Sequence, residues 1–183
     1  RRNGGTMSAA SEFLSALAHG LTKNQRLILC AFGGDPANVK PDAWRPRPWQ
    51  PGQKLGLNGN WNAYVTVASF TIAPDKTWRR KKACFAAAHA LMVDDIGTKV
   101  AADTINLAPS AIIETSPDNF QYWYFFSEPE PDAAAFDSLI RAFIAGKLLG
   151  ADPGMSGITR VGRLPGYPNL KAIVAPTTVG IAA

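Results

Sequence analysis

The chain has 183 residues, of which 46% are hydrophobic and 18% charged, with 16 glycines and 14 prolines. These values exclude a disordered, collagen-like or coiled-coil protein and indicate one compact domain with long loops. No apolar run is long enough to span a membrane and no signal-peptide pattern occurs, so we expect an intracellular protein without a membrane partner.

The N-terminal third is predicted to hold one helix and two strands. Residues 1–7, which begin with Arg rather than Met, are set aside as a tail or an expression remnant. Ser8 is a suitable cap for a helix over residues 8–19, and Gly20 a suitable stop. Residues 27–32 are apolar enough for a buried strand.

The next segments alternate between loop, strand and helix. Residues 35–60 are rich in proline, which predicts a long irregular loop with a functional role. Residues 64–70 are β-branched and aromatic, which predicts a strand. Thr77 can cap a helix that runs to about Ala87, and residues 89–96 return to strand character.

The second half is predicted to contain a hairpin and a longer helix. Strands over residues 111–116 and 120–126 are joined by a Pro-Asp-Asn turn. Asp132 can cap an amphipathic helix that ends at Gly150, and a last strand is expected near Ile173. This mixture predicts an α+β fold, in which a mixed or antiparallel sheet is flanked by helices.

Cysteine usage and charge distribution narrow the function. Cys30 and Cys84 match neither a disulfide framework nor a zinc ligand set, so we expect buried free thiols. The chain carries 19 basic and 14 acidic residues, and the basic ones gather at residues 76–82 and 160–171 around an acidic middle. This arrangement suits a cation site facing a polyanion, although residues 76–82 also fit a solvated helix face.

The acidic pair Asp94-Asp95 ends an apolar strand, where carboxylates are costly to desolvate unless a cation compensates them. Adjacent strand residues point to opposite faces, so both acids serve one site only if the strand bends between them. Gly97 favours such a bend. The alternative is a solvated Asp-Asp turn.

Two further segments contain polar groups that suit a nucleotide. Gln121 is a lone amide on an apolar strand, and its partner is either core backbone or a bound nucleotide. Arg160, Arg163 and Lys171 lie among Gly and Pro turns and form a candidate phosphate cradle, with a plain surface loop as the alternative. His89 is interpreted as a core or edge histidine rather than a proton-transfer group.

Together the three segments resemble the RepB-like primases of plasmids and phages, a branch of the archaeo-eukaryotic primase-polymerase superfamily. The resemblance covers about residues 60–175. It lies in Val93-Asp94-Asp95, in Glu114-Thr115-Ser116-Pro117 with Asn119 and Gln121, and in Ala151-Asp152-Pro153 with residues 162–171. Many superfamily members carry a histidine at the end of the second motif. Gln121 stands at that position here, as glutamine does in the RepB-like branch.

The resemblance implies an RRM-like primase-polymerase catalytic domain over residues 8–183, cut from a longer replication protein. It implies that Asp94, Asp95 and Asp152 bind Mg²⁺ or Mn²⁺ and are catalytic. The nucleotide is expected to contact the polar and basic residues of the second and third motifs, namely Ser116, Asn119, Gln121, Arg160, Arg163 and Lys171.

The implied function is primer synthesis by two-metal nucleotidyl transfer from NTP or dNTP on single-stranded DNA, in the cytoplasm of the host cell. A helicase domain or subunit is a further expected partner. Basic residues 76–82 and the loop with Trp44 and Trp49 are candidates for template contacts, with core packing as the alternative for the two tryptophans. Rival hypotheses are a non-catalytic single-stranded-DNA-binding initiator module and a metal-dependent nuclease.

Overall fold

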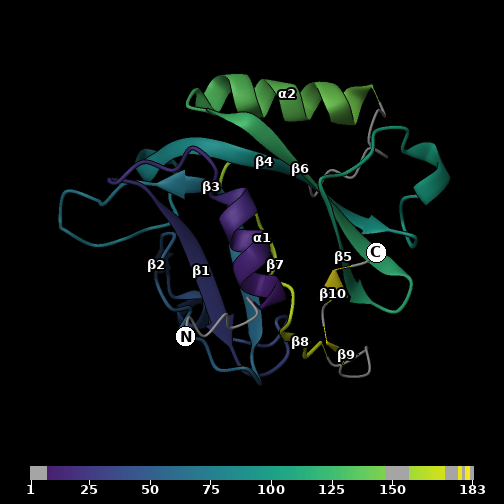
Figure 1. Ribbon diagram of the computed structural model, residues 1–183, viewed down its shortest axis with the longest axis horizontal. Coiled ribbons are helices and arrows are strands. Elements are labelled where there is room, and N and C mark those ends of the chain that lie inside the picture. The colour runs from purple at the N-terminus through teal and green to yellow at the C-terminus, as the bar shows by residue number, and fades with distance from the viewer. Residues whose placement is uncertain (1–7, 147–156, 172–176, 179, 182–183) are drawn as a thin grey trace, which may run out of the picture.

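The fold is an antiparallel sheet with two α-helices packed on it (Figure 1). The computed structural model describes residues 8–146, 157–171, 177–178 and 180–181. Within these residues the strand order is β10-β5-β6-β4-β3-β1-β2, β7 pairs with β3, and β8 pairs with β9 in a small second sheet. The predicted α+β class is confirmed.

The described elements follow the chain in a simple order. They are α1 (Ala9–Leu17), β1 (Arg26–Phe32), β2 (Arg47–Trp49), β3 (Asn62–Phe70), β4 (Phe85–Ile96), β5 (Ala111–Ser116), β6 (Asn119–Glu130), α2 (Ala133–Ala145), β7 (Val161–Arg163), β8 (Pro168–Asn169), β9 (Thr177–Thr178) and β10 (Gly180–Ile181), with 3₁₀ turns at Pro41–Trp44, Lys82–Cys84 and Ala102–Thr104.

Helix α1 packs on β6 through Phe13, whose ring meets Trp123 edge-on at 5.1 Å between centroids. The predicted cap is confirmed, because the Ser8 side chain accepts a hydrogen bond from the Ser11 backbone N–H. The helix ends at Leu17, two residues earlier than predicted, with Ala18 as its C-cap, and Gly20 follows with a positive φ of 72°. Burial of Phe13 beside the wholly buried Trp123 anchors the helix to the centre of the sheet.

Helix α2 covers the other face of β6. Its Phe136 contacts Phe126, whereas Phe13 of α1 contacts Phe125, and neighbouring strand residues point to opposite faces. Asp132 caps α2 as predicted, but the helix ends at Ala145 rather than near Gly150, a residue outside the described part of the chain. No helix in the described residues is long and apolar enough to cross a membrane.

The sheet forks at β3, which shares one edge between two partners. Ala68–Phe70 pair with the start of β4, whereas Tyr64–Thr66 pair with β7. β7 approaches the end of β4 closely, because a Cβ on Gly162 would overlap the Trp123 ring and the Met92 sulfur. The fork therefore brings the cationic β7 segment beside the acidic end of β4.

The helix predicted from Thr77 to about Ala87 is wrong. Only Lys82–Cys84 form a 3₁₀ turn, and β4 already begins at Phe85. Alanine favours helix locally, but Ala88 and Ala90 lie fully buried in the sheet, where their small side chains suit a strand covered by other elements. Tertiary packing overrides the local preference.

The Pro-rich loop is less irregular than expected. It contains a 3₁₀ turn at Pro41–Trp44 and the short strand β2, whose Pro48 occupies an edge position where no ladder donor is required. Cys30 and Cys84 are buried and unbridged, as predicted. The strand expected near Ile173 lies outside the described residues.

His89 is a structural residue, as the sequence indicated. It is buried in β4, with Nδ1 3.1 Å from the His19 carbonyl oxygen and Nε2 3.0 Å from the Ser69 hydroxyl. Burial lowers the pKa of His89, an effect that the hydrogen bond to the His19 carbonyl partly offsets.

We expect the free energy of unfolding to fall as the pH drops below about 6.5, the pKa of histidine in an unfolded chain. Below this pH the unfolded chain binds a proton at His89 that the folded chain does not bind. The free energy of unfolding then falls by up to about 1.4 kcal/mol per pH unit. Urea unfolding between pH 7.5 and 5.5 should show a shallower dependence for His89→Gln than for the parent. The exposed-site control His19→Gln, which keeps the carbonyl contact, should retain most of the parental slope, because the charge of His19 is the smallest contribution to the lowered pKa of His89. Equal slopes for His89→Gln and the parent would contradict this assignment.

Candidate active site

A bulge near the end of β4 brings the two predicted acids into one site. Between Val93 and Ile96 the register with β6 shifts by one residue. Asp95 at the bulge adopts a positive φ of 59°, a conformation that aspartate tolerates better than most residues. The strand therefore bends as the acid-pair hypothesis required, and both carboxylates line the same cavity.

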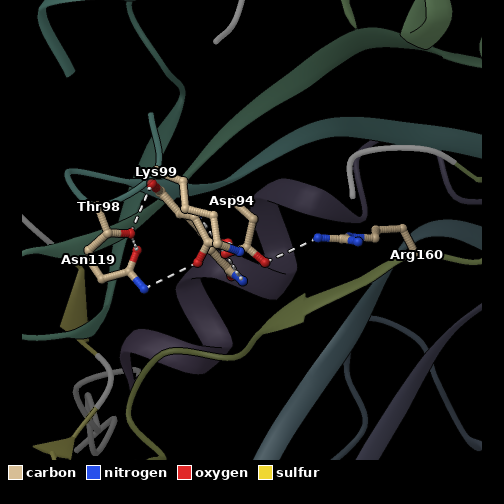
Figure 2. A network of polar contacts seen from close by, with 7 residues as sticks. Asp94, Thr98, Lys99, Asn119 and Arg160 are labelled. Atoms are coloured by element: carbon tan, nitrogen blue, oxygen red, sulfur yellow. Dashed lines mark hydrogen bonds and ion pairs between the residues drawn. The ribbon is translucent and has the colours of Figure 1, made fainter. Parts of the chain in front are cut away.

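Asp94 is held by an amide and a guanidinium (Figure 2). Gln121 Nε2 donates to Asp94 Oδ1 over 3.1 Å, and Arg160 Nη2 donates to Asp94 Oδ2 over 3.1 Å. The Arg160 side chain is 26% exposed and that of Asp94 24%, so the ion pair is only partly screened by solvent. Gln121 thus has a polar partner in the site rather than only core backbone.

Asp95 has a matching pair of contacts. Lys99 Nζ donates to Asp95 Oδ2 over 2.6 Å, and Asn119 Nδ2 donates to Asp95 Oδ1 over 3.4 Å. Burial opposes ionisation of Asp95, but Lys99, Asn119 and the charge of Lys171 outweigh it and lower its pKa. Asp95 is therefore a carboxylate at neutral pH.

A buried arginine connects the site to the rest of the fold. Arg163 is only 7% exposed; its Nη1 donates to Asn62 Oδ1 over 2.8 Å and its Nη2 to Asn169 Oδ1 over 2.6 Å. Its backbone N–H donates to Gln121 Oε1 over 2.9 Å, and its guanidinium lies 4.9 Å from the centre of the Tyr64 ring. Burial lowers the pKa of Arg163, partly offset by Tyr64 and Asp94.

These groups surround a polar cavity of about 240 Å³. Of the predicted site residues, the cavity is lined by Asp94, Asp95, Asn119, Gln121, Arg163 and Lys171. Arg160 reaches the site through its ion pair to Asp94. Ser116 is not among the lining residues, and its neighbour Thr115 takes that place. Asp152 lies outside the described residues.

The sequence interpretation missed several residues of the site. Lys99 follows Asp95 by four residues, and three backbone N–H groups of residues 98–100 donate to the Asp95 carbonyl, so a tight turn returns it to the acid. The four-residue spacing between Asp95 and Lys99 could have indicated that the two side chains pair. Asn62, Tyr64 and Asp35 come from distant segments, and nothing local in the sequence marks them.

A larger hollow of about 570 Å³ lies elsewhere, between β6 and α2. Its lining is mainly apolar and includes Phe125, Phe126 and Leu139. Since the titratable residues there are only Glu128 and Glu130, the smaller polar cavity is the better candidate for chemistry.

The donor set of the polar cavity suits a hard divalent cation. Two carboxylates lie side by side, and each is paired with a protein cation, so the negative charge of the site is one that cations balance. Among the described residues no group of three His, Cys, Asp or Glu side chains converges. Two protein carboxylates suffice for Mg²⁺, which keeps waters and takes further oxygens from substrate phosphates.

The basic run at residues 76–82 does not present one face. Arg79 pairs with Asp75, whereas Arg80 lies 5.8 Å above the Trp44 ring and donates to the Thr159 carbonyl over 3.2 Å. Trp44 packs against Phe32 and Tyr64, and Trp49 is buried. Arg80 is therefore the basic residue of this run that lies next to the segment carrying Arg160.

Solved structures share this fold. The primase-polymerase (PrimPol) AEP domain of cyanophage S-2L matches with a TM-score of 0.59 and 18% identity, covering 94% of this chain and 86% of that one. The catalytic domain of the primase RepB′, solved with initiator DNA, matches with a TM-score of 0.57 and 17% identity over 96% of this chain and 85% of that one. A structure of the primase RepB′ matches with a TM-score of 0.52 and 17% identity, covering 95% of this chain and 56% of that one.

The fold is thus that of the catalytic domains of archaeo-eukaryotic primases. The sequence profile described as the RepB DNA-primase N-terminal domain matches residues 43–176. Because this match spans most of the chain, the protein belongs to the RepB primase family and is a primase or primase-polymerase domain of replication. No curated protein sequence matched.

Proposed function

We propose that this domain synthesises primers by nucleotidyl transfer from NTP or dNTP on a single-stranded DNA template. The observation that carries the proposal is the convergence of Asp94 and Asp95 on one polar cavity that Arg163 and Lys171 also line. Family membership supports the same chemistry. In the reaction a 3′-hydroxyl oxygen forms a bond to the α-phosphorus, the bond to pyrophosphate breaks, and the hydroxyl proton passes to water.

The residues divide this work by charge. Asp94 and Asp95, with Asp152, are the proposed ligands for two ions of Mg²⁺ or Mn²⁺. Bound metal supplies Lewis-acid activation of the hydroxyl and neutralises the leaving pyrophosphate. Arg160 and Lys171 offset triphosphate charge, while Ser116, Asn119 and Gln121 orient the nucleotide. Arg163 is also proposed as a nucleotide contact. Because it is buried, its main proposed role is to hold Asn62 and Asn169 in place.

One assay separates this proposal from its alternatives. The chain is incubated with single-stranded templates, labelled nucleotides and Mg²⁺ or Mn²⁺. Extension of labelled products supports primer synthesis. Degradation of the template indicates a nuclease, and binding that is insensitive to chelator without incorporation indicates a non-catalytic initiator module.

The remaining aspects follow from the replication context. We propose that residues 8–183 act as one catalytic domain of a plasmid or phage replication protein, in the cytoplasm of the host cell. A helicase domain or subunit is the proposed partner that supplies single strands.

Arg80 is the proposed template contact, since it is fixed by Trp44 and by the Thr159 carbonyl next to Arg160. Arg80→Gln is expected to weaken binding of single-stranded DNA about three- to tenfold in chelator, because one phosphate contact is lost. Fluorescence anisotropy at several salt concentrations should show a shallower salt dependence. Arg26→Gln is the matched control, since Arg26 also lies over a tryptophan, Trp78, at 5.4 Å. Equal affinities of the two variants for single-stranded DNA would argue against Arg80 as a template contact.

A further inference from the structure

We propose that Lys99 and Arg160 are displaceable counter-cations, which leave the two carboxylates when divalent metal binds and then contact the incoming triphosphate. The inference rests on the proposed function and adds Lys99 to the residues that act on the nucleotide. It concerns a step that precedes chemistry, namely the exchange of protein cations for metal.

The contacts of the two acids are arranged in parallel. Each carboxylate receives a side-chain amide on Oδ1 and a protein cation on Oδ2, and Asp94 Oδ1 also accepts from the Asp95 backbone N–H over 3.0 Å. For Asp94 these are Gln121 and Arg160; for Asp95 they are Asn119 and Lys99 (Figure 2). The amides fix the orientation of the acids without charge, so the cations are the groups that metal must replace.

Charge balance favours an exchange over simple addition. Two carboxylates carry two negative charges, which Lys99 and Arg160 neutralise. A divalent ion supplies the same charge from one position, so its entry with both protein cations still in place leaves an excess of positive charge in a partly buried site. Release of the two side chains leaves the two carboxylates balanced by the divalent ion and frees two cations beside the phosphates.

A different feature of each cation favours its release. The Lys99 side chain is 74% exposed, on a turn whose backbone hydrogen bonds are independent of its ammonium group. Arg160 Nε is buried and has no hydrogen-bond partner among the described residues. An unpaired buried donor is costly, so the Asp94-bound position of Arg160 leaves part of its binding capacity unused. A phosphate oxygen is an acceptor of the kind this guanidinium lacks.

The exchange predicts two effects of opposite sign from one substitution. Lys99→Met removes a competitor for Asp95, so the affinity for Mn²⁺ without nucleotide should rise about two- to fivefold, as expected for loss of an exposed ion pair. The affinity for a non-hydrolysable nucleoside triphosphate with Mg²⁺ should fall by a similar factor. Arg160→Met should change both affinities in the same directions and by more, about tenfold, because its ion pair is less exposed.

Two controls separate exchange from general electrostatics. Lys171 lines the cavity but forms no ion pair with either acid in the described residues. Lys171→Met should therefore lower the affinity for the triphosphate with little gain in the affinity for Mn²⁺. Arg79, paired with Asp75 at the same four-residue spacing as Lys99 with Asp95, lies outside the cavity, so Arg79→Met should change neither affinity.

The experiment measures free Mn²⁺ by electron paramagnetic resonance and triphosphate binding by titration calorimetry, with thermal unfolding as a check on folding. The exchange is supported if Lys99→Met and Arg160→Met each raise the affinity for Mn²⁺ and lower the affinity for the triphosphate. An unchanged Mn²⁺ affinity or an unchanged triphosphate affinity in folded Lys99→Met overturns it while leaving the metal site intact. Absence of Mn²⁺ binding by the parent chain, by contrast, contradicts the proposed function itself.

Discussion

Asp94→Asn is expected to reduce primer synthesis about a thousandfold, the scale of a metal contribution worth several kcal/mol to the transition state. The substitution preserves the size of the side chain and an oxygen that can accept from Gln121 Nε2. It removes the negative charge that a divalent ion requires. The measurement is incorporation of labelled nucleotide on a single-stranded template with Mg²⁺ or Mn²⁺.

The matched control for this loss is Asp118→Asn. Asp118 is an exposed acid in the β5–β6 turn, with φ of 59°, a conformation that asparagine also tolerates. It does not line the cavity, so its variant should retain parental activity. Thermal unfolding of both variants checks that the fold is preserved. Parental activity in folded Asp94→Asn would show that the acidic pair is not catalytic.

The acidic pair also shows which features of the site could be predicted from the local sequence. Two acids and a glycine at the end of an apolar run predicted a bent strand, and the bulge at Asp95 is that bend. The hairpin of β5 and β6 was equally readable, because a Pro-Asp-Asn turn separates two strands of suitable pattern. Such features depend on a few neighbouring residues.

What the sequence did not predict depends on contacts between distant segments. Asn62 begins β3 and is wholly buried, yet its amide oxygen accepts from Arg163, 101 positions away. A buried asparagine is indistinguishable from a turn residue until its partner is known. The failed helix near Ala87 has the same origin, since only the pairing of β4 with β3 and β6 makes that alanine-rich segment a strand.

Arg163→Lys is expected to lower the free energy of unfolding by about 2 to 4 kcal/mol, although it preserves the charge. The two Nη groups of Arg163 donate to Asn62 and Asn169, and lysine has one terminal nitrogen that cannot reproduce this fork. Asn62 Oδ1 and Asn169 Oδ1 each keep one backbone donor, from Leu170 and Lys171, so the expected cost is the loss of two buried hydrogen bonds to a charged group. Urea unfolding at neutral pH measures the change.

Arg160→Lys serves as the comparison, because Arg160 makes one partly exposed ion pair and should cost at most about 1 kcal/mol. A large loss of stability at Arg163 alone places this residue in the framework that positions Gln121, whose Oε1 accepts from the Arg163 backbone N–H. Equal stability of the two variants, with triphosphate affinity lost only in Arg163→Lys, would instead assign Arg163 to the phosphates. The buried guanidinium would then have to exchange its asparagine partners for substrate, which its low exposure opposes.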